Sequence, residues 1–233
     1  DNFLELGGSS LNQVALTSKI FKEFKTKIPL AYTYEVNTIR KQARLIDIGI
    51  DISDQDAFIM NPGKESFLFC FPPAVGFSYC YENLSKIIPG YSLCGFNFIV
   101  DEDRLDQYVA SINKMQPNGE VILMSYSMSG LITFKVAEAL EKAGRVVSDI
   151  ILLDCIWHGN RKPQDLNRGE DFFNEIERDL RNIQMDFMIE KVRDVVIGYF
   201  HYTYSFFDLP VINADLHCIT STEADMFEGS VTG

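Results

Sequence analysis

Short runs of consecutive apolar residues recur from residue 67 onward, separated by stretches with helical spacing. The apolar runs predict buried strands at 67–71, 93–98, 121–124, 150–153 and 216–219. The helical patterns between them cover about 78–88, 104–114 and 131–143. Strands that are apolar throughout and alternate with amphipathic helices are typical of a parallel sheet covered by helices on both faces. The pattern therefore predicts an α/β domain over residues 67–233.

Residues 170–207 break this alternation. Glu170 and Asp171 open a long helical stretch rich in Phe, Met, Ile and Tyr, with no strand inside it. A helical insertion of this kind usually lies over the carboxyl ends of the strands, where ligands bind. We therefore predict a helical lid at about 170–207, although such an apolar stripe fits simple packing on the sheet equally well.

The first fifty residues have a different pattern, which predicts two or three helices. Ser9 or Ser10 can cap a helix whose apolar positions recur until Pro29, and another helix is expected from about 37 to 46. Such a short helical unit has a thin core, so we expect further residues before Asp1. The stretch 49–66 lacks sustained periodicity and contains turn-forming residues. The predicted domains are thus a helical unit at 1–48, a linker at 49–66 and the α/β domain at 67–233.

The distribution of charge supports this division. Residues 1–50 carry seven basic and five acidic residues, whereas the remainder carries 14 and 28, and the whole chain of 233 residues has a net charge of −12. The acidic balance argues against a nucleic-acid surface or an anionic membrane surface. No apolar run approaches the roughly 18 residues of a membrane span, and the opening DNFLELGG has no secretory signal.

The five cysteines are widely spaced and form no CxxC pair. Their odd number and spacing fit reduced thiols better than disulfides or zinc ligands. We therefore expect a cytoplasmic protein and no metal site.

The most specific chemical signal is a strand–turn–helix pattern around Ser127, in the sequence VILMSYSMSGL. A nucleophile elbow needs a serine on a sharp turn between a buried strand and a helix, which exposes the hydroxyl and directs helix amides at a developing oxyanion. The residues two before and two after must be small. They are usually glycine, whereas here they are Ser125 and Ser129, and an ordinary serine cap remains an alternative.

Two neighbouring segments fit the same interpretation. The strand IILL ends in Asp154, where an acid that orients a histidine belongs, although a turn-forming or capping role is open. The first strand runs into a Pro72-Pro73 loop that can hold the backbone amide of Ala74 opposite Ser127, with the Met128 amide as a second oxyanion donor. A plain turn is the alternative for this loop.

At the N-terminal end, Gly7 and Gly8 precede two serines at a predicted helix start. This arrangement exposes a hydroxyl for modification and free helix amides for an anion, but it also fits a simple Gly-Gly turn with a serine cap.

Together these segments resemble two known families. DNFLELGGSSL resembles the attachment motif of peptidyl carrier domains, usually Asp-x-Phe-Phe-x-Leu-Gly-Gly-(His or Asp)-Ser-Leu. FCFPPAVG, SYSMSG and ILLD, in that order, are similar to the type I thioesterase that ends many bacterial non-ribosomal peptide synthetases. The resemblance covers nearly the whole chain and implies an α/β-hydrolase fold with a helical lid, preceded by part of a small helical carrier domain.

The resemblance also implies roles for individual residues. Ser10 would carry 4′-phosphopantetheine, because it precedes the Leu of the motif. Ser127 would be the acyl-accepting nucleophile and Asp154 the carboxylate that orients the histidine, with the Ala74 and Met128 amides as the oxyanion hole. The implied partners are upstream synthetase domains in the same polypeptide, a phosphopantetheinyl transferase and a peptidyl substrate.

The histidine of the triad is the gap in this assignment. His158 is close to Asp154 in sequence, His201 lies in the aromatic lid stretch, and His217 lies in the last predicted strand. In the family the catalytic histidine follows one further strand, so we expect it beyond Gly233 and regard His217 as the less favoured candidate. The chain then resembles a terminal module cut at both ends.

The expected function is release of a carrier-bound peptide through a seryl acyl-enzyme, by hydrolysis or by ring closure. The alternatives are an editing thioesterase, a free-standing esterase, and a carrier and docking module whose hydrolase half has lost activity. The last is motivated by the two elbow serines.

Overall fold

The computed structural model describes residues 3, 6–7, 16, 19–24, 38–48, 57–155, 168–182, 189–205 and 208–221. Two compact units make up the chain. One contains Asp1–Gln55 and Phe172–Val192, and the other contains Asp56–Asp171 and Arg193–Gly233. The predicted domain boundaries stay a prediction.

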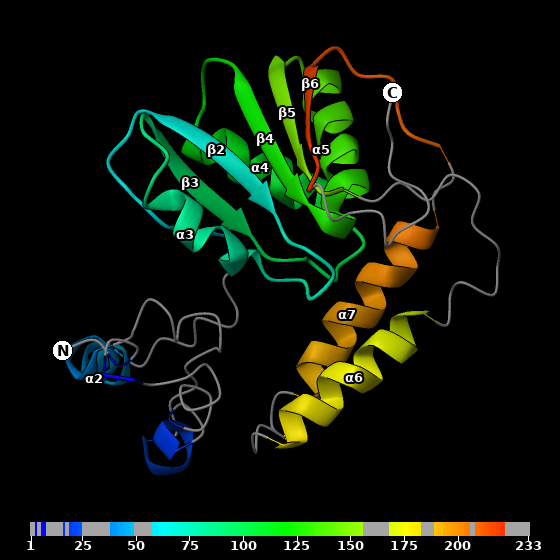
Figure 1. Ribbon diagram of the computed structural model, residues 1–233. Coiled ribbons are helices and arrows are strands. Elements are labelled where there is room, and N and C mark those ends of the chain that lie inside the picture. The colour runs from blue at the N-terminus through cyan, green and yellow to red at the C-terminus, as the bar shows by residue number, and fades with distance from the viewer. Residues whose placement is uncertain are drawn as a thin grey trace. The chain divides into compact units, whose positions relative to one another are not determined.

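The second unit is built on a six-stranded sheet with the order β1-β3-β2-β4-β5-β6 (Figure 1). All strand pairs are parallel except β1 with β3, which is antiparallel. This confirms the predicted, mostly parallel α/β fold. The strands are β1 (Ala57–Ile59), β2 (Ser66–Phe71), β3 (Tyr91–Phe96), β4 (Val121–Tyr126), β5 (Val147–Leu153) and β6 (Asp215–Ile219).

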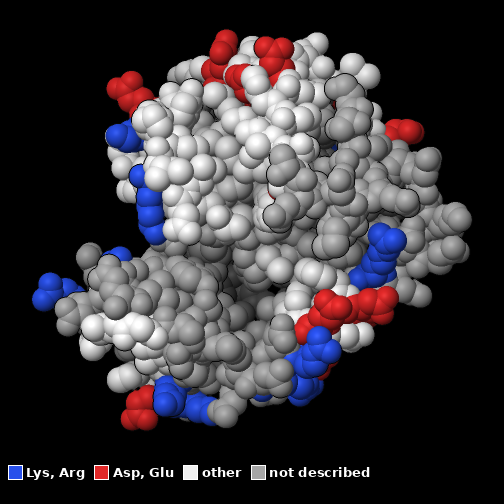
Figure 2. All heavy atoms as spheres, in the orientation of Figure 1, with Lys and Arg blue, Asp and Glu red and all other residues white. Residues whose placement is uncertain are grey.

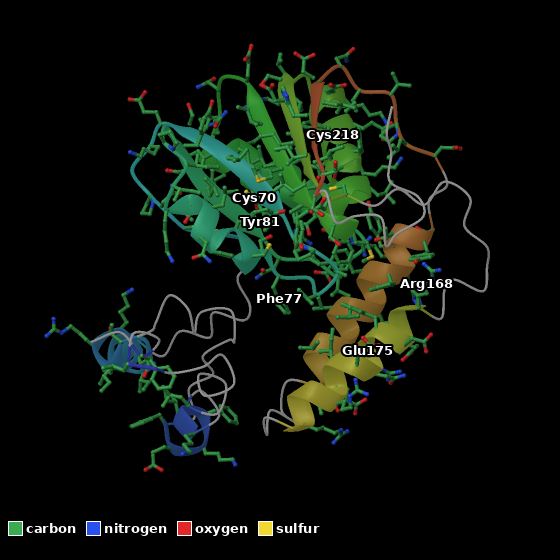
Figure 3. All side chains as sticks on the ribbon, in the orientation of Figure 1. Cys70, Phe77, Tyr81, Arg168, Glu175 and Cys218 are labelled. Carbon is green, nitrogen blue, oxygen red and sulfur yellow. The ribbon has the colours of Figure 1, made fainter. Side chains whose placement is uncertain are left out.

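The helices cover both faces of this sheet. Alternate side chains of a strand point to opposite faces, so the apolar strands place core residues on each side. On one face, Phe71 of β2 packs edge-on against Tyr108 of α4 (Arg104–Met115), with ring centroids 5.4 Å apart. On the other face, Cys70 lies in a cluster with Tyr81, whose hydroxyl donates a hydrogen bond to the Phe71 carbonyl (Figure 3). The helices of the sheet are η3 (Ser78–Tyr81), α3 (Glu82–Ser85), α4 (Arg104–Met115), η4 (Ser127–Ser129) and α5 (Gly130–Lys142).

The remaining helices are α2 (Ile39–Ile48), α6 (Arg168–Asn182) and α7 (Ile189–Tyr204). The helical prediction for 170–207 is therefore confirmed over the two last helices. Of the earlier predicted helix, residues 16 and 19–24 are described and are helical. No helix among the described residues is both long and apolar enough to cross a bilayer.

Within the predicted linker at 49–66, residues 57–59 form the short strand β1 against β3, a strand that the sequence did not indicate, and the linker boundaries stay a prediction. Asn61 then continues the contact with this edge, since its side-chain amide donates to the carbonyls of Ser85 and Tyr91 at 2.9 Å each. A three-residue strand is too short to give an alternation signal in the sequence. Residues 49–56 lie outside the described part.

The acidic balance of the sequence is visible on the surface. Figure 2 shows acidic side chains gathered at the top of the view, where the strands of Figure 1 begin. On the same face the basic side chains that are drawn form no continuous patch.

Helix α7 packs closely on the loop that follows β2. Gly76 has φ +80°, and a Cβ built on it would lie 2.1 Å from Cγ1 of Val195. The Gly76 amide also donates to the Pro73 carbonyl at 2.8 Å, and its carbonyl accepts from the Phe98 amide at 2.9 Å. Glycine is therefore required here both for the turn and for the approach of the helix.

We expect Gly76→Ala to lower the free energy of unfolding by about 2–4 kcal/mol, because it adds a steric clash to an unfavourable φ. Gly119→Ala is the matched control. Gly119 has φ +82° with nothing within 4 Å of its Cβ position, so the substitution should cost only about 1–2 kcal/mol. The urea midpoints of both variants measure the difference, and equal midpoints would contradict the proposed close packing.

Candidate active site

Ser127 lies on a strained turn between β4 and α5. Strand β4 ends at Tyr126, the short helix η4 spans Ser127–Ser129, and α5 begins at Gly130. Ser127 has φ +59° and is half-buried. A non-glycine residue in this region costs on the order of 1–3 kcal/mol and is enriched at active sites. The local geometry is the strand–turn–helix that the sequence predicts for a nucleophile elbow.

The serines that replace the usual glycines fit into this turn. The Ser129 hydroxyl accepts a hydrogen bond from the Tyr126 amide at 2.7 Å and donates one to the Tyr126 carbonyl at 2.8 Å. The Ser125 hydroxyl accepts a hydrogen bond from the Cys155 thiol at 3.3 Å. Both serines are fully buried. Their side chains therefore close the turn and tie it to the next strand without disrupting the elbow.

Cys155 remains a thiol in this position. Burial raises the pKa of Cys155 to about 11, against a smaller opposing effect of its bond to Ser125. At neutral pH the sulfur is protonated and can donate to the serine oxygen. Cys155 thus provides the hydrogen-bond donor for the buried Ser125 hydroxyl.

Asp154 leaves the sheet beside Ser127. Tyr126 and Leu153 are paired in the parallel register of β4 and β5, so the next residue of each strand emerges at the same edge. Asp154 also has a positive φ, of +42°. Its amide donates to the Ile219 carbonyl at 2.8 Å, and its carboxylate accepts a hydrogen bond from the Ser221 amide. These bonds anchor the acid to the end of β6, at the edge where Ser127 lies.

The Pro72-Pro73 loop emerges at the same edge. Phe71 is paired with Ser125 in the register of β2 and β4. The loop continues through half-buried Ala74 to Phe77 (Figure 3). The segments that carry Ala74, Met128 and Asp154 therefore leave three adjacent strands at one end of the sheet. A further contact that the sequence did not indicate joins this loop to α7, where the Tyr199 hydroxyl donates to the Pro72 carbonyl at 2.7 Å.

The described histidines do not complete a triad. Nε2 of His217 lies 2.7 Å from Oδ1 of Asp149, and His217 is paired with Ile151 in the register of β5 and β6. It therefore lies in the middle of β6 with a different acid as its partner. His201 is exposed on α7, and His158 lies outside the described residues.

We expect His217→Gln to leave the rate of peptide release within about twofold of the wild type, because the change lies on a surface strand away from Ser127. A hydrogen bond from Ser148 and a further one from His217 hold the pKa of Asp149 below its usual value. A lowered carboxyl pKa stabilises the fold above the unfolded pKa of about 4, and this contribution is lost as pH falls through the folded pKa. His217→Gln should thus cost less than about 1 kcal/mol at pH 6 and less still in acid. A large loss of release without unfolding would contradict this structural role.

The carrier motif is described only in part, and Ser10 itself lies outside the described residues. Gly7 has φ +90° and is exposed, with nothing within 4 Å of its Cβ position. Leu6 beside it is also exposed. Gly7 lies three residues before Ser10, and the attachment role of Ser10 stays a prediction. Among the residues that are described, no group of three or more His, Cys, Asp or Glu side chains is arranged to hold a metal ion.

Comparison with known proteins gives the same picture. The family model for the thioesterase domain matches residues 67–205, and the model for the phosphopantetheine attachment site matches residues 1–46. The second match shows that the cofactor is covalently attached 4′-phosphopantetheine.

Relatives at the sequence level are peptide synthetases. Surfactin synthase subunit 3 of Bacillus subtilis (strain 168) is 34% identical over 228 residues, which is 95% of this chain and 18% of that protein. Tyrocidine synthase 3 of Brevibacillus parabrevis is 37% identical over 158 residues, which is 67% of this chain and 2% of that protein. The chain thus spans less than a fifth of the length of these relatives.

Solved structures agree with the sequence comparison. The thioesterase domain that cyclises the lipopeptide antibiotic surfactin matches with a TM-score of 0.58 and 27% identity, over 75% of this chain and 90% of that one. A four-domain non-ribosomal peptide synthetase matches in fold with a TM-score of 0.62 and 21% identity, over 98% of this chain and 21% of that one. With the strained serine turn and the carrier motif, these matches show that the chain belongs to the thioesterase domain family and carries a phosphopantetheine attachment site on its N-terminal side.

Proposed function

We propose that this chain releases a peptide from a non-ribosomal peptide synthetase, by moving it from the carrier arm on Ser10 to the hydroxyl of Ser127. The observation that carries the proposal is the strained turn at Ser127, with Asp154 emerging at the same edge from the next strand. The carrier motif in the same chain supports a thioester as the substrate. A free-standing esterase would not need this motif.

The proposed reaction has two steps. The Ser127 oxygen attacks the thioester carbonyl while a histidine accepts its proton, and Asp154 orients that histidine. The amides of Ala74 and Met128 hold the oxyanion, and collapse of the intermediate breaks the C–S bond and returns the proton to the leaving thiol. Phosphopantetheine supplies the thiol that carries the peptide to the site. The Ser127 ester is then opened by a nucleophile, which regenerates the hydroxyl.

The second nucleophile determines the product. Water gives a linear acid, whereas an amine or hydroxyl of the bound peptide gives a ring. Ring closure requires that the peptide folds back and that water is kept out, which is the role we propose for the lid over about 170–207. The aromatic side chains Phe98, Tyr199 and Tyr202 are buried where α7 packs on the α/β unit. Their apolar packing is consistent with a dry site, and both products remain part of the proposal.

The partners follow from this function. We propose upstream synthetase domains in the same polypeptide, a phosphopantetheinyl transferase that modifies Ser10, and a cytoplasmic location. The five cysteines are all described and are free thiols, which fits a reducing compartment.

The test uses the intact protein. A phosphopantetheinyl transferase loads the carrier from a peptidyl coenzyme A, and mass spectrometry follows the bound peptide and the released product with time. A released acid or ring supports the proposal, and the ratio of the two assigns the second step. A thioester that persists as long as in the Ser127→Ala variant would overturn it and favour a non-catalytic docking module. Release only of short acyl groups from other carriers would favour an editing thioesterase.

A further inference from the structure

Helix α7 contacts the Pro72-Pro73 loop at two points that are one helical turn apart. Val195 fills the space above Gly76, where a Cβ would lie 2.1 Å from its Cγ1. Tyr199 lies four residues later and hence on the same face of the helix. Its hydroxyl donates a hydrogen bond to the Pro72 carbonyl at 2.7 Å. The loop that carries Ala74 is therefore fixed from outside the sheet by one side of α7.

Tyr199 is itself rigidly held. Its side chain is fully buried, and its ring stacks on Phe98 with centroids 4.3 Å apart and planes 16° apart. The Phe98 amide in turn donates to the Gly76 carbonyl at 2.9 Å. Burial raises the pKa of Tyr199 well above its ordinary value. The hydroxyl therefore stays protonated and acts as a hydrogen-bond donor. The ring, the loop and the helix thus form one interlocked unit.

The Tyr199 hydroxyl lies near the nucleophile elbow, because, against the larger effect of burial, the Ser129 side chain lowers the pKa of Tyr199. The Ser129 hydroxyl closes the turn by bonding both the amide and the carbonyl of Tyr126. The phenol therefore bonds the loop that carries Ala74 and lies near the turn that carries Met128.

We propose that Tyr199 is a positioning residue that holds the loop carrying the Ala74 amide, one of the two proposed oxyanion donors, in place beside the elbow that carries the other, the Met128 amide. The inference rests on the proposed function, since it concerns the same acyl-transfer site. Tyr199 does not touch the reacting atoms. It acts through the Pro72 carbonyl, whose orientation is transmitted along two stiff proline residues to the Ala74 amide. Oxyanion donors are effective only when they are already aligned, so a small displacement of this loop slows the chemical step.

This role makes catalysis dependent on the contact between α7 and the Pro72-Pro73 loop. The helix belongs to the segment that we propose as the lid, and the phenol belongs to the part of it that packs on the α/β unit. When α7 contacts the loop, the loop is aligned with the elbow. When the contact is lost, the amide of Ala74 is free to turn away.

Tyr199→Phe in the intact protein tests the inference, because it removes the hydroxyl but keeps the ring on Phe98. We expect kcat for a soluble peptidyl thioester to fall about tenfold with KM within about twofold, less than the loss expected for removing an oxyanion donor outright. Hydrogen exchange of the amides in 72–77 should become faster. Placing para-aminophenylalanine at this position restores a donor and should recover most of the rate.

Tyr204→Phe is the matched control. Tyr204 is also buried on α7 and stacks on Phe200, with ring centroids 6.0 Å apart. The same chemical change there should alter neither kcat nor exchange in 72–77. Thermal midpoints of both variants show whether they are folded at the assay temperature. If Tyr199→Phe is unstable, kcat of the para-aminophenylalanine variant is compared with that of the wild type instead, and a rate well below the wild type in a folded variant overturns the role of the donor.

The outcomes separate this inference from the proposed function. An active wild type with an unchanged kcat in Tyr199→Phe, or with equal losses in Tyr199→Phe and Tyr204→Phe, overturns the positioning role and leaves the proposed function standing. Faster exchange without a fall in kcat also overturns it, because the contact would then be only structural. A wild type that never releases the thioester overturns both.

Discussion

Replacing Ser127 by alanine is expected to lower the rate of peptide release by at least about ten-thousand-fold. The reason is that no acyl-enzyme can form, and loss of the nucleophile in a serine hydrolase removes nearly all of the catalysis that the triad provides. The free energy of unfolding should change little, because Ser127 is only half-buried and the substitution removes a single oxygen atom. Single-turnover release from the loaded carrier, followed by mass spectrometry, measures the effect.

Ser129→Gly is the control for this prediction. It restores the residue usual in nucleophile elbows but removes the two hydrogen bonds to Tyr126. We expect a loss of about tenfold or less, because an ordinary hydrogen bond contributes about 1 kcal/mol. Release by Ser127→Ala at a rate close to that of Ser129→Gly would show that another group is the nucleophile.

Replacing Ser10 by alanine is expected to abolish loading of the carrier completely. The phosphopantetheine arm is joined to a hydroxyl, and alanine has none. Intact mass after incubation with coenzyme A and a phosphopantetheinyl transferase should show the added arm on the wild type and none on Ser10→Ala. Hydrolysis of a soluble peptidyl thioester should continue, because Ser127 is untouched.

The neighbouring serine gives the matched control for this second prediction. Ser9→Ala changes the position where the carrier motif usually has His or Asp, and it should still accept the arm. If Ser9→Ala blocks modification and Ser10→Ala does not, the motif is out of register by one residue. If neither is ever modified, the peptide does not arrive on this carrier.

Most of the sheet could be predicted from the sequence because the central strands β2, β3 and β4 are largely buried. The expectation of a buried strand at 216–219 was wrong, because all five residues of β6 are exposed. Runs such as FLFCF have no polar position, and the structure places Phe69, Cys70 and Phe71 in the core. The edge strand β1 was missed, because three residues carry no period and it is held by β3 and Asn61. Its pairing is a tertiary contact that local composition does not encode.

The site was predictable where it depends on local order along the chain. A strand followed by Ser127 and a helix, and a strand followed by Asp154, are each visible in a few consecutive residues. Tyr199 was not, since its contact with Pro72 joins residues 127 positions apart. In the sequence it is one aromatic residue among several in the stretch 199–204, and nothing distinguishes it from core packing. The partnership of His217 with Asp149 likewise depends on the register of β5 and β6.

The central claim is that the hydroxyl of Ser127 is the nucleophile, held on a strained turn at the end of β4. The most direct measurement is to treat the intact protein with a fluorophosphonate bearing a peptide-like group, digest it, and locate the adduct by mass spectrometry. The account predicts a single adduct on Ser127 and none in Ser127→Ala. An adduct on another serine, or no adduct on a protein that still releases its peptide, would contradict it.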